Sequence, residues 1–90
     1  MKYLRKQDLV FNDIDGEVVL LNVKTGKYFG MDAIGSRIWQ LIDEPKTLAE
    51  LVQTLTKEYD VSESQCSKDT EVFLNRLADD ELLEAHEALA

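Results

Sequence analysis

Short apolar runs separated by turn residues fill the first third of the chain. Residues 9–11, 17–23 and 27–30 are rich in residues favoured in β-strands, and Asn, Asp, Thr and Gly lie between the runs. This alternation predicts three strands joined by tight turns. The middle run is apolar without a break from Val18 to Leu21, which predicts a central strand. The third run is short and flanked by lysines, which predicts an edge strand.

From Asp32 onward, apolar residues recur with the period of about 3.6 that is typical of helices. In the first helix, Asp32 is expected to cap the free amides and Gly35 to permit close approach of another backbone. The second helix begins with the capping box Thr47-Leu48-Ala49-Glu50, and the third begins after Ser62 and runs to about Ala78. The residues predicted on or beside the inner helix faces are Ile34, Ile38, Trp39, Leu41 and Ile42 (Trp39 beside the face), then Leu48, Leu51, Val52, Leu55 and Tyr59, then Cys66, Thr70, Phe73, Leu74 and Leu77.

The predicted fold class is α+β, with a three-stranded antiparallel sheet followed by three helices. Ninety residues fit one small domain, 1–90, with a core from about residue 9 to residue 84. After the third helix, Leu82 and Leu83 are expected to return to the core and residues 85–90 to fray. With 44% hydrophobic and 31% charged residues, the chain is expected to fold without a metal ion or a disulfide.

Charge narrows the class of partner. The net charge is −8, and residues 46–90 hold four basic and eleven acidic side chains. Proteins that bind nucleic acid gain affinity from basic side chains on phosphates, so nucleic acid is not an expected partner. The acidity fits either simple solubility or electrostatic steering, and both remain open. No apolar stretch is long enough for a signal peptide or a membrane span, so a cytoplasmic location is expected.

Residue types that carry most enzyme chemistry are scarce. His86 is the only histidine and lies in the tail, and Cys66 is expected on an inner helix face, so a Cys–His nucleophile pair is not expected. The metal-site spacings C-x-x-C and H-x-x-x-H are absent, and the acidic run 79–81 fits a solvated helix end. The glycines fit turns rather than a phosphate loop. We therefore expect a protein without enzymatic activity, metal or cofactor.

The predicted edge strand at residues 27–30 favours peptide binding instead. An open edge presents unpaired backbone groups, to which an extended peptide can add as a further strand. On a helical wheel, Asp69, Val72 and Arg76 lie together beside the inner face of the third helix, where Val72 is either rim packing or the apolar floor of a contact site. The apolar residues expected near the edge are Tyr28, Phe29, Met31, Val72 and Phe73. The alternative is that the three aromatic residues belong to the core, and alternation places at least one of the two strand aromatics there.

Several motifs occur in a fixed order along the chain. They are the runs 15–22, 25–32 and 35–42, the positions Thr47, Leu48, Leu51, Leu55 and Tyr59, the pattern Asp69-x-x-Val72-Phe73-Leu74-x-x-Leu77, and the run Leu82-Leu83-Glu84. Over about residues 9–84, this set resembles the PqqD-like family of RiPP recognition elements, which bind leader segments of ribosomally made precursor peptides. Within the family, the tyrosine-containing strand and the Gly-x-x-Ile-Trp helix look most like the stand-alone leader-binding proteins of lasso peptide biosynthesis.

The resemblance implies a fold similar to winged helix-turn-helix domains, with peptide rather than DNA as the ligand. It implies that a precursor's leader lies as an added strand on the third strand, with the third helix as the other wall of the groove. The residues that it assigns to this site are Lys27, Tyr28, Phe29, Gly30, Met31, Asp69, Val72, Phe73 and Arg76. It also implies a transglutaminase-like leader peptidase that receives the precursor, and a cyclase that completes the product. Gly30-Met31-Asp32 departs from the Leu-Asn pair that is common in the family.

Three alternatives remain open from the sequence. One is a peptide chaperone of the kind found in PQQ biosynthesis, which works with a radical SAM enzyme, although that kind usually lacks the Thr-Gly-Lys-Tyr-Phe hairpin. Another is a winged-helix DNA-binding regulator, against which the net charge of −8 argues. The third is a structural subunit of an enzyme complex without affinity for any leader.

Overall fold

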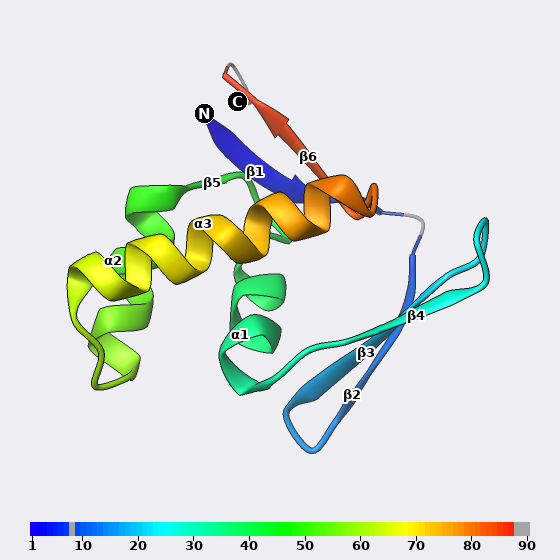
Figure 1. Cartoon of the computed structure of the whole chain (residues 1–90), viewed down its shortest axis with the longest axis horizontal. Coiled ribbons are helices and arrows are strands. Elements are labelled where there is room, and N and C mark those ends of the chain that lie inside the picture. Colours follow the sequence, from blue (N-terminus) through cyan, green and yellow to red (C-terminus); the bar gives the residue numbers. More distant parts are fainter. Residues whose placement is uncertain (8, 88–90) are drawn as a thin grey trace.

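The structure, a computed structural model, describes residues 1–7 and 9–87 (Figure 1). The helices within this part of the chain are α1 (Ala33–Leu41), α2 (Leu48–Glu58) and α3 (Glu63–Asp79). The strands are β1 (Lys2–Arg5), β2 (Val10–Ile14), β3 (Glu17–Asn22), β4 (Lys27–Gly30), β5 (Lys46–Thr47) and β6 (Leu83–His86). The predicted α+β class is therefore correct, with two three-stranded antiparallel sheets in place of one.

Strands β2, β3 and β4 form one antiparallel sheet in that order. β3 is central, and its Val18 and Leu20 are buried, as the unbroken apolar run predicted. Gly16 and Gly26 lie in the two turns with φ angles of 86° and 73°, a backbone conformation that favours glycine. Among the described residues β4 pairs only with β3, which confirms the predicted edge strand.

The second sheet, in the order β5-β1-β6, is not anticipated by the sequence pattern. β1 lies between the other two strands, so segments near both chain ends lie side by side (Figure 1). The expectation of fraying is wrong for Ala85 and His86, because β6 pairs with β1 along its length and is anchored by the buried Leu82 and Leu83. Residues 88–90, to which that expectation also applied, lie outside the described residues.

All three helices begin at the predicted caps. The Asp32 carboxylate and the Ser62 hydroxyl each accept a hydrogen bond from the backbone amide three residues later, at 2.7 and 3.2 Å. Thr47 and Glu50 form the predicted capping box, with reciprocal hydrogen bonds of 3.1 and 2.9 Å. These bonds also lower the pKa of the Glu50 carboxyl from its ordinary value.

The buried side of α1 is rotated relative to the predicted side. Trp39, expected beside the inner face, is 0% exposed, whereas Ile34, expected on that face, is 38% exposed. The sheet explains the rotation, because Phe11 of β2 packs edge to face on the Trp39 ring with centroids 5.8 Å apart. Gly35 does permit a close approach, but of the Phe73 ring rather than of another backbone: a Cβ built on Gly35 would lie 3.1 Å from that ring.

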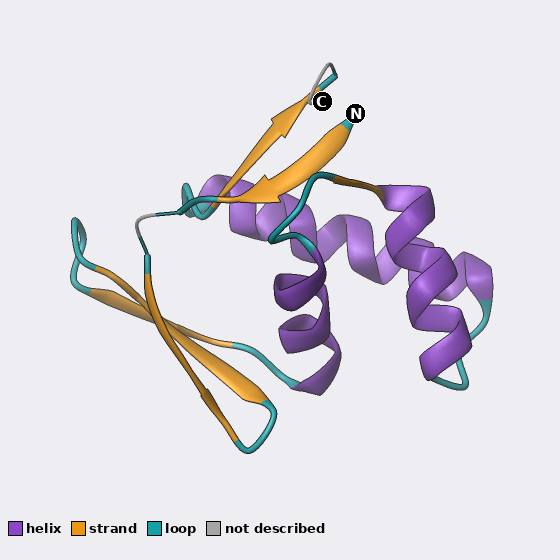
Figure 2. Cartoon of the chain, turned by 180° about the vertical axis from the view of Figure 1, so that it is seen from behind, coloured by secondary structure: helices purple, strands orange, loops and turns teal. Residues whose placement is uncertain are grey.

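The inner faces of α2 and α3 follow the prediction more closely. Their buried members are Leu51, Val52, Leu55, Cys66, Thr70, Leu74 and Leu77. Leu48, Tyr59 and Phe73 are partly buried and pack against this core. From behind, α1 lies between the β2-β3-β4 sheet and α2, with α3 crossing on the far side (Figure 2). The likeness to winged helix-turn-helix domains stays a prediction.

Candidate functional site

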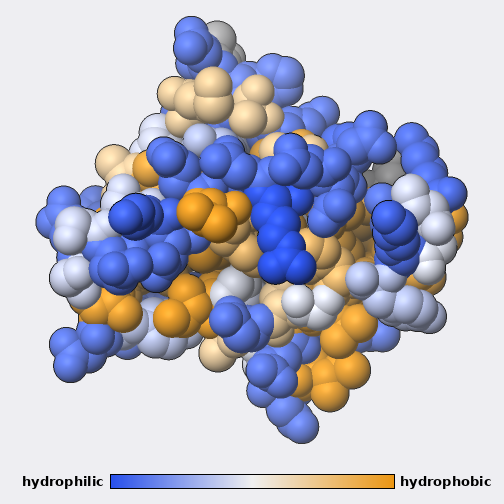
Figure 3. Space-filling model, viewed as in Figure 1, coloured by the Kyte–Doolittle hydropathy of each residue, from blue (hydrophilic) through white to orange (hydrophobic). Residues whose placement is uncertain are grey.

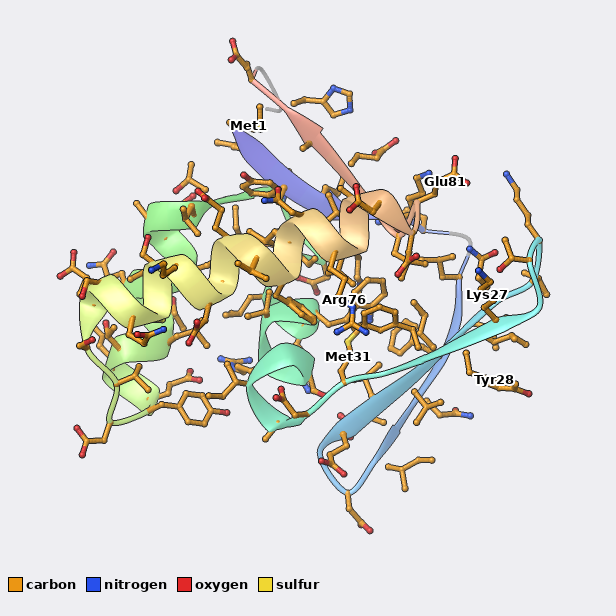
Figure 4. The ribbon with its side chains drawn as sticks, in the orientation of Figure 1. Met1, Lys27, Tyr28, Met31, Arg76 and Glu81 are labelled. Carbon is orange, nitrogen blue, oxygen red and sulfur yellow. The ribbon has the colours of Figure 1, made fainter. Side chains whose placement is uncertain are left out.

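A groove lies between the free edge of β4 and helix α3. At one end of the groove, Lys27 and Asp79 line the same cavity, and at the other end Asp32 and Asp69 line another. β4 and α3 therefore run past each other in opposite directions. Figure 4 shows the two elements with the side chains that lie between them. The groove thus joins an unpaired strand edge to one face of a helix.

An aromatic pair and an arginine occupy the centre of the groove. Phe29 of β4 packs edge to face against Phe73 of α3, with ring centroids 6.5 Å apart. The Arg76 guanidinium lies over the Phe29 ring, 5.0 Å from its centroid. Among the described residues, Arg76 forms no ion pair or side-chain hydrogen bond. Its donors are consequently available to a ligand that lies along β4.

A mainly apolar cavity of about 280 Å³ lies at the Asp32 end of the groove. Ile34 and Val61, both exposed, open into it, and Phe73 forms the wall on the side of the groove centre. Its full lining is Asp32, Ile34, Gly35, Ile38, Leu55, Tyr59, Val61, Gln65, Cys66, Asp69, Thr70 and Phe73. A cavity of this kind accepts an apolar side chain and offers polar partners at its rim.

A second cavity, of about 210 Å³, lies where β4 meets the end of α3. Lys27 and Phe29 line it from the strand, and three consecutive acidic residues line it from the helix end, where the helix dipole is also negative. These acidic residues are Asp79, Asp80 and Glu81. The groove is therefore acidic at both ends, with Arg76 near its middle.

The structure brings most of the predicted site residues to the groove, but it changes the orientation of two. Phe29 faces α3, whereas Tyr28 is 74% exposed and points away from that helix (Figure 4). The alternation expected for this strand thus places one aromatic inward and one outward. Met31 is only 5% exposed, and its amide donates to the Val18 carbonyl oxygen at 2.9 Å, so its side chain belongs to the core.

The remaining predicted residues are accessible. Val72 is 63% exposed on α3, and Asp69 and Arg76 are exposed one turn to either side of it. Gly30, the last residue of β4, has open space where a side chain would extend. The predicted residues that lie at the groove are therefore Lys27, Phe29, Asp69, Phe73 and Arg76, whereas Tyr28 points away from it and Met31 belongs to the core.

Sequence reasoning missed parts of both cavities. The sequence pattern predicts Ile34 in the core and the acidic run after α3 at a solvated helix end, whereas in the structure they line the two cavities. The available signal was the length of α3: a helix that begins beside Asp32 and runs antiparallel to β4 ends near Lys27. The position of the α3 end relative to β4 depends on the angle at which α3 crosses the sheet. The periodicity of a single helix carries no information about that angle.

Cys66 and His86, which the sequence analysis considered as a nucleophile pair, lie in different parts of the structure. Among the described residues, no group of three or more His, Cys, Asp and Glu side chains could hold a metal ion. Cys66 is buried with its Sγ 3.8 Å from the Thr70 hydroxyl, while His86 is exposed on β6 in the other sheet. The groove offers a ligand the unpaired backbone groups of β4, apolar side chains and charged side chains. No helix in the described part of the chain has the length and apolarity needed to cross a membrane.

Comparison with known proteins gives one family match. The family model described as coenzyme PQQ synthesis protein D (PqqD) matches residues 17–83, which include β3, β4 and all three helices. A search of the curated proteins finds no significant match.

Solved structures give closer matches. The structure described as TbiB1 in complex with the TbiA(beta) leader peptide is 44% identical, has a TM-score of 0.83, and the match covers 94% of this chain and 99% of that one. A lasso peptide synthetase B1 complexed with the leader peptide is 20% identical with a TM-score of 0.82, covering 94% and 100%. The PqqD part of Methylobacterium extorquens PqqCD, a RiPP recognition element, is 23% identical with a TM-score of 0.73, covering 93% and 89%.

Proposed function

Because this chain belongs to the PqqD family, we propose that it is a non-catalytic adaptor that binds the leader segment of a ribosomally made precursor peptide. The leader adds as a strand to the free edge of β4 and lies against α3. The protein then presents the precursor to a separate enzyme. The observation that carries this proposal is the unpaired edge of β4 beside an apolar groove, in a chain 44% identical to a protein described in complex with a leader peptide.

Backbone and side chains have separate parts in this mode of binding. The unpaired amides and carbonyls of β4 supply hydrogen bonds that are largely independent of leader sequence, each worth about 0.5–1.5 kcal/mol net. Side chains of an added strand alternate, so every second one turns toward α3, at a spacing of roughly 7 Å. These inward side chains meet Phe29, Phe73 and Arg76 in the centre and the two cavities at the ends. Specificity for a leader therefore comes from the groove rather than from the edge.

The proposed setting is the biosynthesis of a lasso peptide in the cytoplasm. The precursor is handed to a transglutaminase-like leader peptidase, and a cyclase completes the product. This setting is supported by the identity of 44% and the TM-score of 0.83 to a leader-bound protein, against 23% and 0.73 for the PqqD part of PqqCD.

A peptide chaperone that works with a radical SAM enzyme in quinone cofactor synthesis is the second candidate. The description of the matching family model, coenzyme PQQ synthesis protein D, favours this second candidate. The two candidates differ in the peptide that binds: the first requires a lasso leader and the second the precursor of the quinone cofactor. Competition between the two peptides for this protein separates them, and the first candidate predicts that the lasso leader wins.

Titration of a fluorescently labelled leader tests the proposal. The TbiA(beta) leader peptide serves as the probe. The second probe is the same peptide with a methyl group on every second backbone nitrogen, so that the peptide edge facing β4 has no N–H groups to donate. We expect saturable binding of the unmodified peptide at micromolar concentration or below, and strong weakening by the methyl groups. Absence of saturable binding for this leader and for the leader encoded beside the gene contradicts the proposal. Equal binding of the methylated peptide contradicts strand addition.

A further inference from the structure

The hydroxyl of Ser36 lies between β3 and β4, at the point where the two strands separate. Ser36 belongs to α1, and its side chain is 0% exposed. Its Oγ accepts a hydrogen bond of 2.8 Å from the Val18 amide and donates one of 3.4 Å to the Met31 carbonyl oxygen. One side chain of α1 is therefore bonded both to β3 and to the residue that follows β4.

The Ser36 hydroxyl takes the place of one bond of the β3-β4 ladder. Val18 and Met31 follow the last ladder pair, Val19 and Gly30, and the Met31 amide donates to the Val18 carbonyl oxygen at 2.9 Å. In an antiparallel pair of this type, the reciprocal bond runs from the Val18 amide to the Met31 carbonyl oxygen. The two hydrogen bonds of Ser36 bridge these same two groups. The ladder accordingly ends at Gly30, and the chain turns from the sheet into α1.

The same register identifies the backbone groups at the free edge of β4. These groups alternate in direction along a strand, and those of Met31 face β3. The N–H and C=O groups of Tyr28 and Gly30 therefore face the free edge, where an added strand pairs. Gly30 is next in the chain to Met31, which Ser36 holds. The Ser36 hydroxyl is thus bonded immediately beside one of the two residues with which a leader pairs.

The preceding residue of α1 contacts the opposite wall of the groove. Gly35 lies against the Phe73 ring of α3, so closely that a Cβ on Gly35 would lie 3.1 Å from that ring. In the space-filling view, apolar side chains gather between α3 and the β2-β3-β4 sheet (Figure 3). Met31 lies on the segment that joins β4 to α1 (Figure 4). Gly35 and Ser36 therefore fix both walls of the groove to the same turn of α1.

We propose that Ser36 is a positioning residue for leader binding, whose hydroxyl holds the Gly30 end of the β4 edge at the distance from α3 that the leader requires. The inference rests on the proposed leader-binding function. Without the hydroxyl, the buried Val18 amide loses its acceptor, which is unfavourable in the interior. The strands regain a bond when the Met31 carbonyl closes onto Val18. That closure moves Gly30 toward β3 and away from the groove.

Ser36→Ala tests the proposal, with Thr56→Val as the matched control. The partly buried Thr56 hydroxyl donates to the Val52 carbonyl oxygen at 2.8 Å on α2, and Thr56 lines neither groove cavity. Each substitution removes one hydroxyl that is hydrogen-bonded to the backbone. Fluorescence polarisation with the labelled leader measures affinity. Amide exchange followed by NMR, with and without the leader, measures protection of the Tyr28 and Gly30 amides.

In the unmodified protein, we expect the leader to protect both amides. In Ser36→Ala, leader affinity should fall about tenfold, the loss expected when both leader hydrogen bonds at Gly30 are broken. Protection should be lost at Gly30 and retained at Tyr28, whereas Thr56→Val should keep both protections and the unmodified affinity. If circular dichroism shows that Ser36→Ala is unfolded, Ser36→Cys takes its place. The thiol has a similar volume but forms weaker hydrogen bonds, so the same pattern is expected with a smaller loss.

Unchanged affinity and unchanged Gly30 protection in the Ser36 variant overturn the proposal. An equal loss of protection at Tyr28 and Gly30 also overturns it, because general loosening of the sheet would then account for the weaker binding. Absence of leader binding by the unmodified protein would instead contradict the proposed function. Leader binding to the unmodified protein that protects neither amide would contradict strand addition.

Discussion

The two sheets differ in how they are built and in what surrounds their edges. The β2-β3-β4 sheet joins neighbours in sequence through tight turns, whereas the β5-β1-β6 sheet joins segments up to 84 residues apart, such as Lys2 and His86. Both sheets have open edges, but among the described strands β4 is the one whose free edge lies beside a groove with a helix as its second wall. An open edge supplies hydrogen-bonding groups; the adjacent helix α3 makes it selective.

A small cluster joins the two sheets. The Arg5 guanidinium of β1 lies over the rings of Phe11 and Trp39, 4.9 and 5.4 Å from their centroids, and donates to the Trp39 carbonyl oxygen at 3.2 Å. Phe11 belongs to β2, and Trp39 to α1. Both sheets are thus fixed to the same helix, and the β4 edge is held in place relative to α3.

Removing the Trp39 side chain from this cluster should have the largest predicted effect on the unfolding free energy. Trp39 is 0% exposed, so Trp39→Ala leaves a cavity between the sheet and α1 and should cost about 3–5 kcal/mol of unfolding free energy. Ile34→Ala is the control on the same helix; since Ile34 is 38% exposed, we expect a loss of no more than about 1 kcal/mol. Urea unfolding followed by circular dichroism measures both. Equal losses for the two variants would show that α1 is buried as the sequence pattern suggested.

Charge reversal in the groove should separate leader binding from folding. Arg76→Glu removes the cation over Phe29 and adds negative charge to an already acidic groove, so leader affinity should fall about tenfold or more. Lys68→Glu makes the same charge change on α3, outside the groove cavities, and should leave affinity nearly unchanged. Fluorescence polarisation with the labelled leader measures both variants. Loss of affinity in both to the same degree would mean that net charge alone governs binding.

Val72→Asp asks whether the exposed apolar side chain of α3 is part of the site. Val72 is 63% exposed, so the substitution should leave the unfolding free energy within about 0.5 kcal/mol. Leader affinity should nevertheless fall severalfold, because an added charge must be desolvated against the bound strand. A calorimetric titration measures the leader affinity, and urea unfolding measures the unfolding free energy. A fall in unfolding free energy that accompanies the loss of binding would show that Val72 contributes to packing rather than to the leader site.

Gly35→Ala gives a smaller and more specific change. The new Cβ would lie 3.1 Å from the Phe73 ring, so the ring must shift toward the groove. Alanine is the better helix former by about 1 kcal/mol, which offsets the strain, so we expect little change in stability. Leader affinity should fall a few-fold, because Phe73 borders both Phe29 and the larger cavity. Unaltered affinity in this variant would place the leader away from Phe73.

The smallest predicted effect concerns an ion pair outside the groove. Arg37 of α1 forms hydrogen bonds of 2.8 and 2.9 Å to the Glu58 carboxylate of α2, which lower the pKa of Glu58 from its ordinary value. A carboxyl whose pKa is lowered on folding stabilises the fold above its unfolded-state pKa, near 4.3, and loses that contribution as the pH falls through the lowered value. Both side chains are about one-third exposed, so solvent keeps the contribution small.

Glu58→Gln tests this pH dependence. The variant should be slightly less stable than the unmodified protein at neutral pH, and the difference should vanish on acidification below the lowered pKa. Leader affinity should not change, since Arg37 and Glu58 line neither groove cavity. A stability difference that grows toward low pH would contradict the assignment of the lowered pKa.

Much of the fold follows from local signals in the sequence. The turns at Gly16 and Gly26 and the capping box at Thr47 are decided by residues close in the chain, and all are present as predicted. The β5-β1-β6 sheet could not be predicted in the same way. Its strands are short and distant in sequence, and Lys2 and Arg5 give β1 no apolar alternation of the usual kind.

The groove was predictable only in part. The family resemblance predicted Phe29 and Arg76 at the site, and the helical wheel placed Arg76 beside the inner face of α3. The place of Ile34 in a cavity and the core position of Met31 depend on how α1 is rotated and on how the chain leaves β4. Both are set by packing of Trp39 and Phe11 between elements, which no single element's pattern encodes.

Amide hydrogen exchange with and without the leader tests strand addition to β4 most directly. If the leader pairs with this edge, amides of residues 27–30 that face away from β3 become protected on leader binding, while amides of β6, an equally open edge, exchange as before. Saturable leader binding that protects β2 or β6 instead, or that leaves β4 exchange unchanged, would contradict the account.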